Sequence, residues 1–190
     1  MEDDYYGHHA TTTLTQPLAL IGAHGSGASQ VAQALCARTG LPFDDIDRTI
    51  EHKAGCSLAA LSLRPEAGRY VELLRAALDQ ALRRQPCPVI ALGPDSLRDA
   101  ACRRRISGAA TLVYLQADAD ELARRASAQL REQPTRHYPA LADADAATPA
   151  RLAELLAERR ADYESATLTI DITARSPIEL AMLLMQRLGI

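Results

Sequence analysis

The sequence predicts a single α/β domain built on a five-stranded parallel sheet flanked by helices. Its 190 residues suit about one domain with a substantial core. Short apolar runs alternate with amphipathic stretches, which is the pattern of βα units in a parallel sheet. A glycine-rich turn follows the first apolar run directly, at residues 22–27.

The first half of the chain supplies two strands and two helices. Residues 17–22 (PLALIG) form a predicted strand that leads into the glycine turn. Residues 28–39 follow as a helix, and Gly40 is the residue expected to end it. Residues 41–47 (LPFDDID) predict a short second strand, and apolar residues at helical spacing predict a helix within residues 66–84.

The second half supplies three strands and a closing helix. Residues 88–93, 110–117 and 167–172 are apolar runs of strand length, and residues 176–189 predict a capped helix with proline just inside its start. Residues 131–149 break the periodicity with prolines and polar residues. Such an insert indicates a lid or functional loop, with a plain surface connection as the alternative.

Residues 1–16 are polar and acidic and are expected to form a flexible N-terminal tail, which leaves residues 17–190 as the domain. The net charge of −3 gives no reason to expect a nucleic-acid or membrane partner, and no apolar run has the length of a membrane helix. The four cysteines contain no CxxC pair, so reduced thiols in a cytoplasmic protein are expected.

The glycine turn nearly matches the phosphate-binding pattern G-x-x-x-x-G-K-[ST]. Gly22, Gly25, Gly27 and Ser29 occupy suitable positions, but Ala28 stands where the pattern has lysine. Backbone amides and a helix N-terminus would still attract phosphate, and Ser29 would place a hydroxyl near Mg²⁺. An ordinary turn between strand and helix is the alternative.

Two acids follow the second predicted strand. Asp45 and Asp47 are two residues apart, so at a strand end both side chains would point to the same side. The carboxyl edge of a parallel sheet is where ligands bind. A magnesium water shell and a substrate hydroxyl are the expected partners, and acids that cap the next helix are the alternative.

Together with the glycine loop, residues 41–55 (LPFDDIDRTIEHKAG) and 159–171 (RRADYESATLTID) resemble the shikimate kinase family. The resemblance runs from about Leu18 to Leu188. It implies a P-loop NTPase of the nucleoside-monophosphate-kinase-like type with a mobile lid. It also implies ATP and Mg²⁺ as cofactors and a small hydroxylated acid as the phosphate acceptor.

The resemblance also implies roles for five residues. Asp47 would hold the substrate hydroxyls as a catalytic residue, and Asp45 would lie near Mg²⁺ with Ser29. Arg136 corresponds to a lid arginine that reaches the active site, Arg159 to an arginine on the substrate carboxylate, and Arg125 to an arginine that stacks on adenine.

The family's F-R-x-x-E segment, whose arginine and glutamate serve the acceptor carboxylate, is changed here. Tyr70 keeps the aromatic position for substrate binding, whereas Val71 and Leu74 replace the two charged residues. Losing both avoids leaving one charge alone. A local shift of this alignment is the alternative, because Arg69 and Glu72 lie nearby.

The family's substrate-binding triple glycine is also changed, and reads Gly93-Pro94-Asp95. Pro94 has no amide to donate, and Asp95 adds a negative charge near an anionic substrate.

The missing lysine limits what could replace it, because Lys53 is the single lysine beside twenty arginines. A lid arginine, Arg131 or Arg136, would be the substitute. Three functions remain open: a non-catalytic or weakly active member that still binds nucleotide, an active small-molecule kinase with a changed acceptor, and a scaffold that regulates a protein partner. The losses on both the phosphate and acceptor sides favour the first.

Overall fold

The computed structural model of the protein describes residues 12–63, 68–132, 140–141 and 145–190. Its centre is a five-stranded, wholly parallel sheet in the order β2-β3-β1-β4-β5, which confirms the predicted fold class. The strands are β1 (Leu18–Ile21), β2 (Phe43–Asp45), β3 (Val89–Ala91), β4 (Thr111–Gln116) and β5 (Leu168–Asp171).

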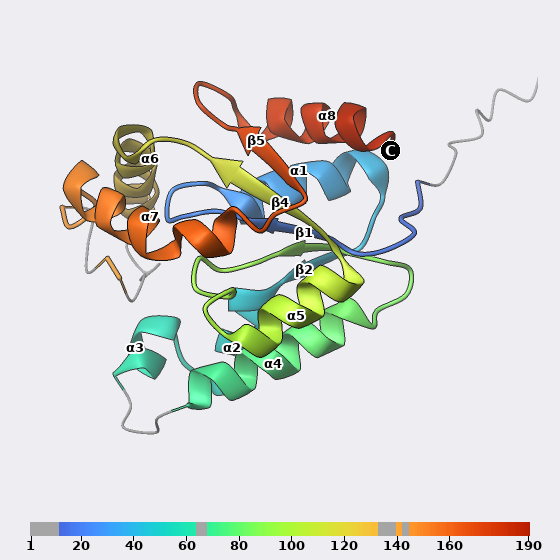
Figure 1. The fold of residues 1–190 in the computed structure, drawn as a ribbon, viewed down its shortest axis with the longest axis horizontal. Coiled ribbons are helices and arrows are strands. Elements are labelled where there is room, and N and C mark those ends of the chain that lie inside the picture. Colours follow the sequence, from blue (N-terminus) through green and yellow to red (C-terminus); the bar gives the residue numbers. More distant parts are fainter. Residues whose placement is uncertain (1–11, 64–67, 133–139, 142–144) are drawn as a thin grey trace, which may run out of the picture.

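Helices cover both faces of this sheet. In Figure 1, α1 and α8 lie on one face and α4 and α5 on the other, while α3, α6 and α7 gather near the end of the sheet where the strands finish. The helices are α1 (Ala28–Thr39), α2 (Ile46–Ala54), α3 (Leu58–Ser62), α4 (Arg69–Leu82), α5 (Ala100–Ala109), α6 (Ala119–Glu132), α7 (Pro149–Tyr163) and α8 (Pro177–Leu188).

Local signals in the sequence account for the ends of the main helices. Gly40 ends α1 in the left-handed conformation, φ 73°, and its amide donates to the carbonyl of Cys36 at 2.9 Å. Ser176 and Glu179 form a reciprocal capping box at the start of α8, one residue before Pro177. Such caps satisfy amides that have no partner inside the helix.

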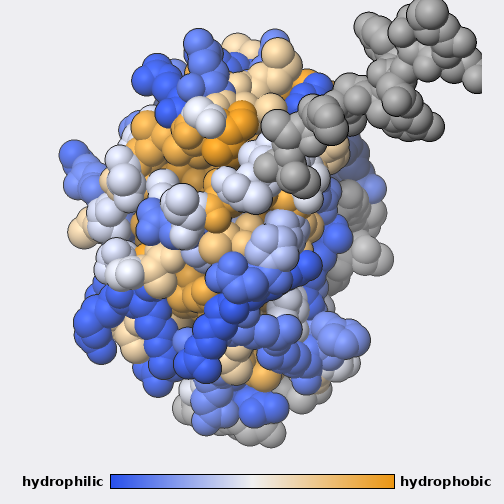
Figure 2. Space-filling view, turned by 90° about the vertical axis from the view of Figure 1, so that its right-hand side faces the viewer, coloured by the Kyte–Doolittle hydropathy of each residue, from blue (hydrophilic) through white to orange (hydrophobic). Residues whose placement is uncertain are grey.

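The core lies between the sheet and the two helix layers. All four residues of β1 are buried, as are the three of β3, because both faces of a central parallel strand are covered. Within α1, Val31 and Leu35 face the sheet and are fully buried. Figure 2 shows the end of the molecule opposite to the edge where the strands finish. This end has a hydrophobic area between hydrophilic side chains.

The strand predicted over residues 41–47 was wrong at its end. β2 stops at Asp45, and Asp47 is already the second residue of α2. Asp45 is the reason, because its side chain accepts a hydrogen bond from the amide of Arg48 at 3.1 Å and so starts the helix. The two acids therefore do not share a strand face.

The long segment between α6 and α7 is described only in part. Leu141 and Ala147 are buried, so this connection packs onto the domain at two points. Arg136 and the rest of residues 133–139, like residues 1–11 of the predicted tail, lie outside the described residues. Among the described helices none has the length and hydropathy needed to cross a membrane.

Candidate functional site

The glycine loop joins β1 to α1 and holds two of its glycines in the left-handed conformation. Gly25 and Gly27 have φ of 88° and 77°, values that side chains disfavour. Gly27 caps α1 without any side-chain hydrogen bond to the first amides. The amides at the positive end of α1 are therefore left for an anion.

The loop encloses a small cavity of about 40 Å³. At Gly22 an added Cβ would lie 2.5 Å from the Oγ of Ser26 and 2.8 Å from the carbonyl oxygen of Leu115, so only glycine fits. Ser29, half-buried, lies on the wall of the cavity. These features fit a phosphate group, with the Ser29 hydroxyl available to its magnesium ion.

Permanently charged cations are missing from the part of this cavity that the described residues form. The described residues that line it include no lysine and no arginine, and Ala28 is among them. Arg131 is 69% exposed and lies 3.8 Å from Asp145, while Lys53 donates to Gln80 at 2.9 Å. Neither cation replaces the loop lysine in the described structure.

Gly25 offers a direct test of the loop geometry. We expect Gly25→Ala to lower the free energy of unfolding by about 1–3 kcal/mol, because its Cβ would lie 2.3 Å from the carbonyl oxygen of Leu122. Urea unfolding measures this. Gly40→Ala is the control, since Gly40 has a similar φ of 73° but nothing within 4 Å of an added Cβ. Equal losses in the two variants would contradict the predicted clash.

The two acids of the second βα junction have different surroundings. Asp45 is 8% exposed, caps α2 and lies 3.7 Å from Nε of Arg48. It lines neither the loop cavity nor the larger one beside it. Asp47 lines both. The alternative of a helix-capping acid thus holds for Asp45, and Asp47 is the acid at the junction of the two cavities.

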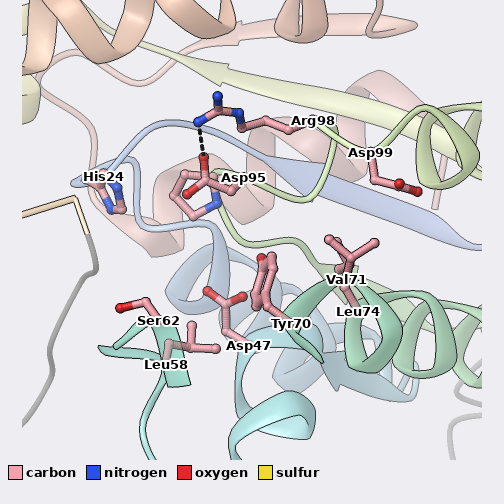
Figure 3. Close-up of a pocket in the computed structure, with 11 residues that line it drawn as sticks. His24, Asp47, Leu58, Ser62, Tyr70, Val71, Leu74, Asp95, Arg98 and Asp99 are labelled. Carbon is pink, nitrogen blue, oxygen red and sulfur yellow. Dashed lines mark ion pairs between the residues drawn. The ribbon is translucent and has the colours of Figure 1, made fainter. Parts of the chain in front are cut away.

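A second cavity, of about 420 Å³, opens beside the loop. We name it the acceptor cavity because it is lined by Tyr70, Val71 and Leu74, which the family resemblance assigns to the acceptor side. Figure 3 shows Asp47 rising from α2 toward its centre, next to the ring of Tyr70. The wall is lined by His24, Asp47, Leu58, Ser62, Tyr70, Val71, Leu74, Pro94, Asp95, Arg98 and Asp99. Val71 and Leu74 both belong to this wall, and their place opposite a phosphate acceptor stays a prediction of the ungapped alignment.

Arg159 is engaged by a carboxylate of the protein itself. Its side chain is 3% exposed, and its Nε and Nη2 donate to Oδ1 of Asp95 at 2.9 and 2.6 Å. Its Nη1 donates to the carbonyl of Leu155 at 3.1 Å and to Glu158 at 3.2 Å. Asp95 is among the described residues that line the acceptor cavity, and Arg159 is not.

The loop after β3 shapes the floor of the acceptor cavity. A Cβ on Gly93 would lie 2.2 Å from Oδ1 of Asp47, so glycine is what lets that carboxylate approach the backbone. The carbonyl of Pro94 accepts a hydrogen bond from the hydroxyl of Tyr163 at 3.1 Å. This contact holds the loop against α7.

Tyr70 remains a neutral hydrogen-bonding group at the wall. Burial raises the pKa of the Tyr70 phenol well above its usual value, and the carboxylates of Asp47 and Asp95 raise it further. Its hydroxyl stays protonated at all ordinary pH values.

Arg125 supports the loop between β5 and α8. Its Nη2 donates to the carbonyls of Ile172 at 2.7 Å and Arg175 at 2.9 Å, and its Nε donates to Glu121 at 2.6 Å. These bonds use the edge of the guanidinium. Its flat face is what the predicted stacking on adenine would use.

Glu121 makes this region sensitive to acid. Hydrogen bonds from Arg124 and Arg125 lower the pKa of Glu121 from 4.5 to about 2. A lowered pKa stabilises the fold above pH 4.5, and this contribution is lost as the pH falls from 4.5 toward 2. We expect the difference in Tm between the protein and Glu121→Gln to shrink over that range. A difference that stays constant with pH would contradict the assignment.

Sequence reasoning missed several residues of the site. His24 is 3% exposed and lines both cavities, and its place inside the glycine loop was the available signal. Arg98 and Asp99 reach the acceptor cavity from the turn before α5, and nothing in the sequence marked them. Asp99 caps α5 and binds Arg75 at 2.6 Å.

The chain is similar in sequence to shikimate kinases. The family model for shikimate kinase matches residues 24–188. A shikimate kinase of Thermobifida fusca (strain YX) is 31% identical over 176 residues, which cover 92% of this chain and 96% of the relative. One from Salinibacter ruber is 34% identical over 167 residues, 84% of this chain and 78% of the relative.

Solved structures have the same fold. A shikimate kinase from Acinetobacter baumannii in complex with shikimate superposes with a TM-score of 0.78 at 23% identity, covering 92% of this chain and 93% of that one. A gluconokinase from Sinorhizobium meliloti 1021 superposes at 0.55 and 18% identity, covering 93% and 95%.

Proposed function

Because this chain belongs to the shikimate kinase family, we propose that it binds nucleotide phosphates but transfers phosphate to shikimate weakly or not at all. The observation that carries this proposal is the absence of any lysine or arginine among the described residues around the glycine loop. In phosphoryl transfer the loop lysine neutralises charge on the transferred group. Losing one such preorganised donor costs about 10²–10³ in rate.

Binding of the phosphates is a separate matter from transfer. The glycine backbone and the uncapped start of α1 supply amide donors, and these require no lysine. Bound ATP with Mg²⁺ would supply the phosphoryl group and the metal charge. In this proposal Ser29 holds the metal ion, Asp45 supports its water shell from the cap of α2, and Arg125 stacks on adenine.

The acceptor side supports the same conclusion. In the family pattern Arg159 contacts the substrate carboxylate, but here it binds Asp95 at 2.6 Å. Val71 and Leu74 add no charge to the cavity. A shikimate carboxylate would therefore meet few unshared positive groups, while Asp47, Tyr70 and Gly93 would still bound the space for an acceptor hydroxyl.

A second candidate is an active kinase with a different acceptor. It is favoured by Asp47, which lies at the junction of the loop cavity and the acceptor cavity and would orient an acceptor hydroxyl toward the phosphate. This function requires a cation from elsewhere, for which Arg136 of the predicted lid is the candidate. A scaffold that regulates a protein partner and uses no nucleotide is the third. A cytoplasmic location is proposed for all three, supported by the four free thiols.

Calorimetric titration with ATP and MgCl₂, combined with an assay of shikimate phosphorylation, tests the proposal. We expect ATP to bind and the turnover rate to lie about 10²–10³-fold below that of the Thermobifida fusca shikimate kinase measured in parallel. Comparable rates would favour the active kinase. Failure of ATP to bind or to raise the Tm would leave the scaffold.

A further inference from the structure

The acceptor cavity has a largely apolar wall. Leu58, Tyr70, Val71, Leu74 and Pro94 line it together, and Figure 3 shows Val71 and Leu74 on α4 beyond the Tyr70 ring. A cavity of about 420 Å³ with such a wall suits a small molecule with an apolar body. When such a ligand packs against these side chains, apolar surface of both the ligand and the wall is removed from water, which favours binding.

The charges on the wall are mainly negative. Asp47, Asp95 and Asp99 supply three carboxylates, and Arg98 is the one guanidinium among the described lining residues. Arg98 is 60% exposed and lies 3.8 Å from Asp95. Asp99 is bound by Arg75 at 2.6 Å, so its charge is compensated from outside the wall. A ligand carboxylate would meet the negative charges of Asp47 and Asp95, and the one lining guanidinium already lies beside Asp95.

Arg159, a further cation beside the wall among the described residues, is already paired within the protein. Each of the three nitrogens of the Arg159 guanidinium donates to a protein oxygen, on Asp95, Leu155 or Glu158. A ligand carboxylate could bind Arg159 in place of Asp95 only if Asp95 moved away. If Asp95 stayed, the ligand would place a second anion beside the buried pair. Asp95 thus takes the place that the carboxylate of an acidic acceptor would occupy.

We propose that the acceptor cavity binds a small uncharged hydroxylated ligand in preference to a carboxylic acid. Its carbon skeleton lies against the apolar wall, and its hydroxyls donate to the carboxylate of Asp47 and to the hydroxyl oxygen of Ser62, whose own proton is donated to the carbonyl of Ala59. Asp95 is the residue that determines specificity, because it neutralises Arg159 from within the protein. This inference rests on the proposed function in one respect, namely that this cavity is the site of the phosphate acceptor.

A matched pair of probes tests the inference without nucleotide. Shikimate and its primary amide have the same ring and hydroxyls and differ in the charge of one group. We expect the amide to bind at least about tenfold more tightly in calorimetric titrations of the full chain, because it brings no second negative charge beside Asp47 and Asp95. Equal or tighter binding of shikimate, or no binding of either at millimolar concentrations, overturns the inference. Neither result bears on ATP binding, so the two proposals fail separately.

Two variants identify the residue responsible. Asp95→Asn keeps an acceptor for Arg159 but removes the negative charge, and we expect it to raise shikimate affinity about tenfold with little change for the amide. Unchanged shikimate affinity in a variant with a normal melting transition overturns the role of Asp95. Arg98→Ala is the control, and we expect its shikimate affinity to stay unchanged. A marked fall in shikimate affinity there would show that Arg98 takes the carboxylate, against the inference.

Discussion

Replacing Ala28 by lysine is expected to raise the rate of phosphate release from ATP by about 10²–10³-fold. Ala28 is the first residue of α1 and lines the loop cavity, so a lysine there would extend toward the bound phosphates. Its ammonium would meet no competing cation among the described lining residues. The affinity for ATP with Mg²⁺ should also rise, by about tenfold or more, as expected for a charged hydrogen bond.

The matched control is Ala28→Met, which supplies a long side chain without a charge. Phosphate release and calorimetric affinity would be measured for both variants and for the unchanged protein. If the rate of phosphate release rises in the lysine variant and not in the methionine variant, the loop lacks only its positive charge. Equal behaviour of the two variants, with ATP still bound, would mean that the loop lysine is not the limiting loss.

Replacing Asp95 by alanine is expected to lower the free energy of unfolding by about 3 kcal/mol. The variant would leave Arg159, 3% exposed, without its main partner, and an unpaired buried charge typically costs about 3–5 kcal/mol. The lower end applies because Asp95 is 29% exposed and Glu158 also contacts Arg159, at 3.2 Å. Urea unfolding with an unchanged m-value measures the loss.

The double variant Asp95→Ala with Arg159→Met should be closer in stability to the unchanged protein than Asp95→Ala alone. Removing both charges leaves no buried ion unpaired, and methionine retains much of the length of the arginine stem. If the double variant is no more stable than Asp95→Ala alone, the loss of stability in Asp95→Ala does not come from an unpaired charge on Arg159. It would then come from the lost packing of the Asp95 side chain.

The sequence by itself determined the sheet, the position of the glycine loop and the departures from the family pattern. These are local properties, because a five- or six-residue apolar run, a glycine turn or a missing lysine is visible within one stretch of chain. The assignment of Val71 and Leu74 to the acceptor site needed only an ungapped alignment, and the structure places both residues on the wall of one cavity. The one local error was the shared strand face of Asp45 and Asp47, because Asp45 caps a helix that starts one residue later.

Only the tertiary structure decided how the site residues are paired. Asp95 and Arg159 are 64 residues apart in the chain, and they meet because the loop after β3 and helix α7 both pack at the edge where the parallel strands end. The same packing brings His24 and Arg98 to the acceptor cavity and Arg125 to the carbonyls after β5. Burial and distance set these partnerships, and neither quantity is present in a list of residues.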